Sequence, residues 1–271
     1  MPKRSKTNYI NRHKLLMHAL VGHENSKGTF KGGQNYHIVR GVYKRQKPLI
    51  IKYVFNSHSH KTALKNLPTF FKTVIKPLWL PALTKVWTNG AEEAENFIKD
   101  WHGTVKKIAK ADYQDYADQF LADHGASKID GITDTDQQWL ANTLRSGVSE
   151  GLSTSDIASN LTDDFDDMSD SRAMTIVRTE TNGAFSYASN ETAKDLLPDG
   201  STKVWWTTSD NPRPSHQDME GTEIDIDDVF EFDDGECAYP CDPDGPDAET
   251  INCMCVLEYS AGSTETEEEN D

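Results

Sequence analysis

The sequence contains no long apolar run. Its most apolar stretch extends from Phe70 to Trp87, whereas a membrane-spanning helix needs about 20 mostly uncharged residues. Three lysines and two prolines interrupt that stretch, namely Lys72, Lys76, Pro77, Pro81 and Lys85. The basic start MPKRSK is not followed by the apolar segment of a secretory signal. We therefore expect a soluble protein that is made in a reducing cytosol and does not contact a membrane.

Cysteine, glycine and proline are also scarce. The 271 residues include 4 Cys, 17 Gly and 11 Pro, which excludes collagen-like, fully disordered and disulfide-rich classes. With 36% apolar residues, the chain is long enough for one or two modest hydrophobic cores.

Acidic residues are almost missing from the first third of the chain. Residues 1–90 contain 17 Lys and Arg and a single acidic residue, Glu24, whereas residues 91–271 contain 11 Lys and Arg and 43 acidic residues. A strongly basic segment attracts polyanions and acidic protein surfaces. Contact with DNA is therefore expected only from residues 1–90, and the alternative is that this segment packs against the acidic remainder of the same chain.

Helical periodicity begins near residue 91. Phe97 and Trp101 start an apolar stripe that continues through Tyr116 and Phe120, as in an amphipathic helix. Further helix starts are predicted at residues 133–136 and 153–156, and a long helix from Ser169–Asp170 to the turn at 198–200.

After residue 200 the apolar period changes from near 3.6 to near 2. Residues 203–208, 222–232 and 253–259 alternate or are β-branched and aromatic, which is typical of strands. Helices followed by strands indicate an α+β fold, mostly helical at first and then a small antiparallel-sheet module with a Cys-containing loop. The expected domains are a basic, partly extended segment 1–90, a helical bundle 91–200, a β-rich module 201–259 and a disordered acidic tail 260–271.

All four cysteines lie in the last 35 residues, as Cys237, Cys241, Cys253 and Cys255. Cys253 and Cys255 would share one face of a strand, and the other two could complete a tetrahedral site of the kind that structural zinc prefers. His216 is an alternative ligand. A disulfide and free buried thiols remain open as other interpretations.

A cysteine nucleophile paired with His216 is a third interpretation. It requires a thiolate beside its base and a group that orients the ring. The surrounding residues match no cysteine protease signature, and a Cys-x-Cys pair is an unfavourable setting for a nucleophile. We therefore expect no catalytic residues and no enzymatic activity.

Three sequence blocks occur in order in the second half of the chain. They are SRAMTIVRTET at 171–181, WW at 205–206 followed by DNPRPSHQDMEG at 210–221, and NCMC at 252–255. Together they resemble the phage Mu F / SPP1 gp7 family of minor head (head morphogenesis) proteins. The resemblance covers about residues 130–258, and its motif positions are Arg178, Glu180, Asp210, Arg213, His216, Gly221 and Asn252.

Physical roles can be assigned to some of these positions. Arg178 and Glu180 could hold the following loop through charge-assisted hydrogen bonds. Arg213 lies between two prolines, which hold its backbone rigidly, and Gly221 suits a tight turn. Met254 stands where the family usually has Arg, and Thr250–Ile251 replace a common His-Pro.

The resemblance implies a minor capsid protein at the portal vertex of a tailed-phage head. Such a protein is made in the bacterial cytoplasm, enters the procapsid during assembly and resides in the virion. The implied partners are the portal and the major capsid or scaffold protein. Contact with packaged double-stranded DNA, or ejection with it, is a further implication for residues 1–90.

Two other functions remain as alternatives. The C-terminal module could be a zinc-dependent hydrolase or a toxin-like effector delivered with the genome, which would need an open metal position and a general base. The chain could also be a DNA-binding adaptor outside the virion.

Overall fold

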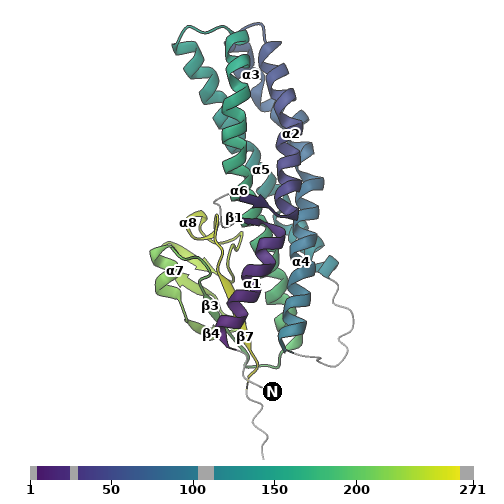
Figure 1. Cartoon of the computed structure of the whole chain (residues 1–271), viewed down its shortest axis with the longest axis vertical. Helices are drawn as coiled ribbons and strands as arrows, with labels where there is room; N and C mark the ends of the chain where they lie inside the picture. Colours follow the sequence, from purple (N-terminus) through teal and green to yellow (C-terminus); the bar gives the residue numbers. More distant parts are fainter. Residues whose placement is uncertain (1–4, 25–29, 103–112, 263–271) are drawn as a thin grey trace, which may run out of the picture. The chain divides into compact units, whose positions relative to one another are not determined.

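The computed structural model describes residues 5–24, 30–102 and 113–262. It confirms the α+β fold, with small antiparallel sheets after the helices and the cysteines near the C-terminus (Figure 1). The helices are α1 (Lys6–Leu20), α2 (Gln34–Phe55), α3 (His60–Phe70), α4 (Leu80–His102), α5 (Tyr113–Ser149), α6 (Thr154–Leu196), α7 (Pro214–Met219) and α8 (Asp247–Thr250). Among the described helices, none is long and apolar enough to cross a membrane.

The chain folds into two compact units. The helical unit comprises Val21–Val86 and Phe120–Val177, and the mixed unit comprises Met1–Leu20, Trp87–Gln119 and Arg178–Asp271. The chain passes from one unit to the other within α4, α5 and α6.

The helical unit buries one apolar face of each of its helices. In α2, Val39, Val42 and Tyr43 are fully buried, at the three- and four-residue spacing that places side chains on one face. Tyr43 and Trp139 both contact the ring of Phe165 on α6. A short hairpin of β1 (Gly22–Glu24) and β2 (Phe30–Gly32) precedes α2.

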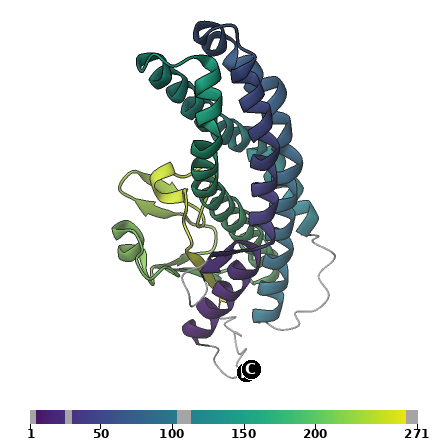
Figure 2. The ribbon, with the colours of Figure 1, turned by 45° about the horizontal axis from the view of Figure 1, so that its top comes forward.

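Ion pairs join the basic and the acidic segments within the helical unit. Three side chains of the basic segment each contact an aspartate of α5 or of the first half of α6. This half of α6 lies alongside α2 in both views (Figures 1 and 2). The pairs are Arg40–Asp170, Lys47–Asp166 and Lys76–Asp130. Part of the basic segment therefore packs against the acidic remainder of the same chain.

Residues 1–90, which the sequence predicts to be partly extended, are mostly helical in their described part. Helices α1, α2, α3 and the start of α4 account for most of these described residues. Their basic side chains do not prevent helix formation, because Lys and Arg are good helix formers whose charges can stay in water while apolar faces pack.

Two predicted helix starts were wrong. Helix α5 continues through residues 133–136, and helix α6 continues through Ser169–Asp170. Polar side chains that could cap a helix instead find partners inside it. The hydroxyl of Thr133 donates to the carbonyl of Ile129, and that of Ser169 donates to the carbonyl of Asp166. The start predicted at 153–156 is observed, with Ser153 and Asp156 bonded reciprocally before α6.

Pro77 and Pro81 interrupt the helix as the sequence predicts. After α3 the chain forms a π-helical turn over Phe71–Ile75 and a 3₁₀ turn over Lys76–Leu78, and α4 begins at Leu80. Phe71, Ile75 and Trp79 are nevertheless buried. The irregular backbone thus still presents apolar side chains to the core.

The mixed unit contains two small sheets. Strand β3 (Thr202–Trp206) lies between β4 (Glu223–Asp225) and β7 (Val256–Ser260), antiparallel to both, and β5 (Phe230–Phe232) pairs with β6 (Gly235–Cys237). Trp205 is fully buried and packs edge-on against Phe230. The hydroxyl of Tyr9 on α1 donates to the carbonyl of Leu257 at 2.5 Å.

Two predicted features fall partly outside the described residues. Ser260, the first residue of the predicted disordered tail, is the last residue of β7, and residues 263–271 lie outside the described part. Residues 103–112, within the stripe that begins at Phe97, lie outside it as well.

Candidate metal centre

The three sequence blocks meet within the mixed unit. The guanidinium of Arg213, from the second block, donates to the carbonyls of Glu249 at 2.7 Å and of Ile251. The backbone N–H of Asn252, which opens the third block, donates to the hydroxyl of Thr179 in the first block at 2.8 Å. Residues far apart in sequence are therefore joined directly by hydrogen bonds.

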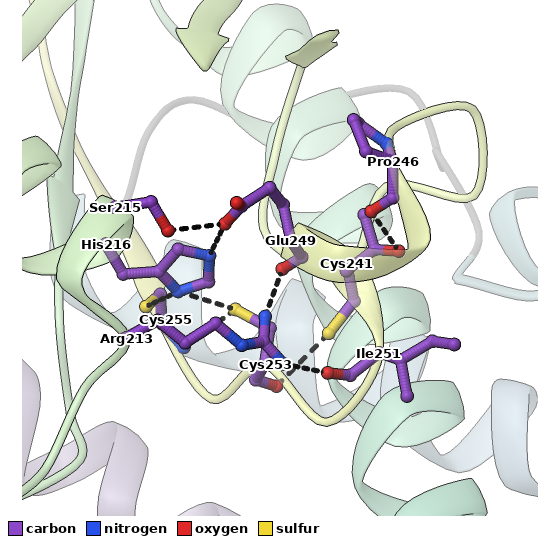
Figure 3. Close-up of polar contacts among 10 residues, drawn as sticks. Arg213, Ser215, His216, Cys241, Pro246, Glu249, Ile251, Cys253 and Cys255 are labelled. Atoms are coloured by element: carbon purple, nitrogen blue, oxygen red, sulfur yellow. Dashed lines mark hydrogen bonds and ion pairs between the residues drawn. The ribbon is translucent and has the colours of Figure 1, made fainter. Parts of the chain in front are cut away.

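Three metal-ligating side chains converge at this junction (Figure 3). The Nδ1 atom of His216, on α7, lies 3.3 Å from the Sγ atom of Cys255 and 3.8 Å from that of Cys253. All three ligand atoms lie within 4.8 Å of one another, and the three residues are 2 to 4% exposed. This group can hold a metal ion.

The backbone around α7 aims His216 at the cysteines. Arg213 is extended and Pro214 occupies the first helical turn, where its missing N–H is tolerated. Gly221 then adopts a φ of +81°, and its N–H donates to the carbonyl of Trp205 at 2.8 Å. The tight turn predicted at Gly221 is therefore observed.

Glu249 and two aromatic rings hold the imidazole. The Nε2 atom of His216 lies 2.9 Å from Oε2 of Glu249, and the hydroxyl of Ser215 donates to the same oxygen at 2.8 Å. The rings of Trp205 and Phe232 contact the imidazole. A carboxylate at Nε2 leaves Nδ1 as the free ligand atom, the usual arrangement behind metal-bound histidine.

Burial favours the neutral forms of the His216 imidazole and the Cys253 thiol. It lowers the pKa of His216, and the nearby guanidinium of Arg213 adds to this effect, while Glu249 opposes it. Burial also raises the pKa of the Cys253 thiol well above its ordinary value. Because a metal binds thiolate and neutral imidazole, loading this site would release the thiol protons.

Asn182 organises the backbone of the Cys-x-Cys pair. Its side-chain amide donates to the carbonyls of Cys253 at 3.2 Å and Cys255 at 3.0 Å. Its Oδ1 atom lies 3.3 Å from Nε2 of His13. Sequence reasoning missed both Asn182 and Glu249. Asn182 directly follows the RTET block, but nothing in the sequence relates either residue to the cysteines.

The other two cysteines differ in position. Cys241 lies beside the Cys-x-Cys pair, with its Sγ atom 3.1 Å from the carbonyl oxygen of Cys253 (Figure 3). Cys237 packs against Gly245, where an added Cβ would lie 2.4 Å from its Sγ atom. The structure therefore brings His216, Cys253 and Cys255 together, places Cys241 next to them and directs Cys237 elsewhere.

The remaining motif residues make structural contacts. Arg178 donates to Oδ1 of Asn252 at the long distance of 3.5 Å, and Glu180 accepts from the indole N–H of Trp87 at 2.9 Å. Asp210 is exposed and lies 3.8 Å from the ammonium of Lys14. The expected role of Arg178 and Glu180, to hold the following loop through charge-assisted hydrogen bonds, stays a prediction.

The thiol, imidazole and carboxylate also follow the order of a catalytic triad. A substrate would have to reach Cys255, which is 4% exposed, and reactive cysteines are usually partly exposed. A hollow of about 680 Å³ is lined by Ser215, Phe230 and Phe232, but by none of the three ligand residues. Burial of the donors favours a structural metal site, whereas three protein ligands alone would leave a fourth position open, as in catalytic zinc sites.

Comparison with known proteins agrees with the motif blocks. Residues 138–258 match the family model described as Phage Mu protein F like protein, so the resemblance of this region to the Mu F family is confirmed. The uncharacterized protein YqbB of Bacillus subtilis (strain 168) is 28% identical over 167 residues. That alignment covers 60% of this chain but only 47% of YqbB. No solved structure gives a significant match.

Proposed function

We propose that this protein is a minor head protein that takes part in head morphogenesis of a tailed phage. The observation that carries the proposal is the family match over 138–258, the region in which the three motif blocks converge. The Mu F-like family is structural rather than enzymatic, which also supports this role. A cross-braced module with buried polar contacts is suited to a building part that must keep its shape during assembly.

Deletion of the coding gene from the phage or prophage that carries it tests this proposal. We expect fewer DNA-filled heads, restored by supplying the full chain, and a few copies of the protein in purified procapsids and virions by quantitative mass spectrometry. A normal yield of infectious particles without the protein, or its absence from purified particles, would contradict the proposal.

We further propose a position inside the head near the portal vertex, with the portal and the capsid or scaffold protein as partners. The support is the family resemblance, together with the exposed lysines and arginines that the basic segment contributes to the helical unit. Crosslinking in purified procapsids, followed by mass spectrometry, should join this chain to the portal protein. Crosslinks confined to the outer capsid surface would contradict this position.

The helical unit is also the proposed site of contact with packaged DNA. Within the described residues, seven exposed cations of α2, α3, the adjoining turn and α4 make no ion pair: Lys44, Arg45, Lys52, Lys61, Lys65, Lys72 and Lys85. A duplex carries closely spaced phosphates, and neutralising them with lysine and arginine releases counterions. Such binding would be independent of sequence and strongly dependent on salt.

A matched pair of double variants tests the DNA contact. Lys61→Gln with Lys65→Gln removes two unpaired cations, whereas Lys47→Gln with Lys76→Gln removes two cations that pair with Asp166 and Asp130. The first variant should weaken binding to a short duplex and lower the salt slope by about 2, because about two phosphate contacts are lost. Equal effects of both variants, or no binding by the unchanged chain, would refute the contact.

We infer that the metal group serves the fold and that its ion is zinc. Nitrogen and sulfur donors are the usual ligands of structural zinc, and the burial of all three donors leaves no access for a substrate. The alternative, a zinc-dependent hydrolase or toxin-like effector, requires an open ligand position. Replacing Cys255 with Ser should therefore impair folding and head assembly together; loss of a catalytic turnover with folding retained would favour the enzyme.

A further inference from the structure

The spacing of the three donors matches a tetrahedral zinc site. With Zn–S bonds of about 2.3 Å and Zn–N bonds of about 2.0 Å, neighbouring ligand atoms lie about 3.4 to 3.8 Å apart. The distances from Nδ1 of His216 to the two sulfur atoms are 3.3 and 3.8 Å. Three corners of a tetrahedron are thus already in place, and one corner remains to be assigned.

Cys241 lies beside this group, although the donors within 4.8 Å of one another are those of His216, Cys253 and Cys255. It is 1% exposed, and its Sγ atom lies 3.1 Å from the carbonyl oxygen of Cys253 and 3.6 Å from the amide nitrogen of Asn182. Figure 3 shows the Cys241 thiol on the side of Cys253 that faces away from the imidazole. Its sulfur therefore lies beside the backbone of Cys253 and must move toward the imidazole to complete the tetrahedron.

The backbone at two positions supports this assignment independently. Cys241 and Asn252 both have a φ of +61°, and they are the non-glycine residues with positive φ in the described part of the chain. A left-handed conformation costs about 1 to 2 kcal/mol for a residue with a side chain. Such strain persists where surrounding structure or function requires it, and here it occurs at Cys241 and directly before Cys253.

The loop that carries Cys241 is held in place by its own polar contacts. The carboxylate of Asp242 accepts from the backbone N–H groups of Ala238 at 2.7 Å and Asp244 at 3.0 Å. The buried ammonium of Lys203 donates to the carbonyl of Ala238 at 3.0 Å. Cys241 is therefore presented by a braced loop.

Cys237 belongs to a different environment. Its thiol fills the space beside Gly245, and no hydrogen bond of the described residues connects it to His216, Cys253 or Cys255. It is as buried as the other cysteines, at 2% exposure, so burial does not distinguish it from a ligand. Its contacts do, because Cys241 lies 3.1 Å from the carbonyl oxygen of Cys253 whereas Cys237 packs against Gly245.

Backbone amides around the group suit thiolate ligands. The N–H of Cys255 donates to the Sγ atom of Cys253 at 3.4 Å, a contact that favours the negatively charged sulfur. Asn182 fixes the two carbonyls of the pair, and Glu249 fixes the imidazole. These outer contacts orient the ligands before a metal arrives.

We propose that His216, Cys241, Cys253 and Cys255 form a four-ligand structural zinc centre, in which Cys241 is the fourth ligand and Cys237 is not a ligand. This proposal rests on the structural role inferred for the metal group. The ion would tie α7, the loop after β6 and the segment before β7 into one cluster. The three thiols would lose their protons on binding.

Cobalt substitution of the full chain tests the ligand set. Co²⁺ in place of zinc gives absorption bands that report tetrahedral geometry. It also gives thiolate-to-cobalt charge-transfer bands, whose intensity grows with the number of thiolates. We expect one metal ion per chain and a three-thiolate spectrum. Cys241→His should retain the metal and lose about one third of the charge-transfer intensity, because one thiolate of three is replaced by a nitrogen.

Cys237→Ser is the matched control, since it removes the buried cysteine that ends β6, just before the loop of Cys241. It should leave the metal content and the spectrum unchanged. Cys241→Ser is a second test variant, expected to hold the metal with at least tenfold lower affinity in competition with a chelator.

The outcomes separate the ligand assignment from the role of the metal. A wild-type spectrum in Cys241→His, or a reduced one in Cys237→Ser, would overturn the assignment while leaving a structural metal intact. A full four-ligand spectrum in a chain whose melting temperature does not change on metal removal would overturn the structural role alone. A full chain that binds neither zinc nor cobalt would refute both.

Discussion

The two units of this protein are stabilised in different ways. In the helical unit, apolar helix faces bury large side chains such as Trp79 and Phe165, and ion pairs join its basic and acidic segments. In the mixed unit, polar side chains reach buried backbone carbonyls: Asn182, Arg213 and Lys203 each bind one or more. The apolar helix faces follow from local periodicity, whereas the ion pairs and the polar contacts of the mixed unit depend on contacts between distant residues.

Replacing a large core side chain in each unit is expected to give the largest loss of stability. Phe165→Ala in the helical unit and Trp205→Ala in the mixed unit should each cost about 3 to 5 kcal/mol, because both side chains are at most 1% exposed. Amide hydrogen exchange, read separately in α2 and in β3, should show that each variant destabilises mainly its own unit. Equal losses in both segments would show that the two units unfold as one block.

Asp136 should make the helical unit less stable as pH rises. Burial raises the pKa of its carboxyl to about 6, although Arg172 and Tyr43 oppose this effect. Because the folded pKa exceeds the unfolded value of about 3.9, the contribution of Asp136 to the free energy of unfolding is fully present below pH 4. It is lost as pH rises through 6, by about 3 kcal/mol in total. Urea unfolding at several pH values should show this slope, and Asp136→Asn should remove it; an unchanged slope in the variant would contradict the assignment.

His13 should give the mixed unit the opposite dependence. Burial lowers its pKa to about 4, while the contact with Asn182 opposes the shift. The stabilisation is complete above the unfolded pKa of about 6.5 and is lost as pH falls through 4, by about 3 kcal/mol. The difference between the unchanged chain and His13→Gln isolates this contribution, measured by hydrogen exchange in α1. A difference that does not vary between pH 7 and pH 4 would exclude it.

Asn182→Ala tests the polar bracing of the mixed unit. The carbonyls of Cys253 and Cys255 would lose a buried donor, so we expect a loss of about 2 kcal/mol. Asn142→Ala, at an exposed position of α5, is the control and should change the free energy of unfolding by less than about 0.5 kcal/mol. Similar losses in both variants would indicate that the bracing contributes little.

The smallest effect is expected at a surface ion pair of the helical unit. Lys47→Gln removes the pair with Asp166, whose carboxylate is 56% exposed. The expected loss is about 0.5 kcal/mol at low salt and nearly none at high salt, because water and ions screen exposed charges. Chemical denaturation at two salt concentrations measures it. A loss above about 2 kcal/mol would show that ion pairs, and not apolar faces, dominate this unit.

The candidate site could be predicted only in part. Its cysteines and His216 were recognisable as possible ligands because few residue types bind soft metals. Glu249 and Asn182 were not, since their roles arise from contacts with residues 33 or more positions away in the chain. Helix starts were wrongly predicted at Thr133 and Ser169 because tertiary neighbours and intrahelical carbonyls satisfy side chains that would otherwise cap a helix end.

The sequence by itself determined the α+β order, the interruption at Pro77, the turn at Gly221 and the Mu F-like region, because each depends on local backbone chemistry or on motif order. Only the tertiary structure decided which cysteines gather around His216 and that the basic segment pairs with acidic helices. Both outcomes depend on which distant side chains the fold brings within a few ångströms, and no local pattern encodes that distance.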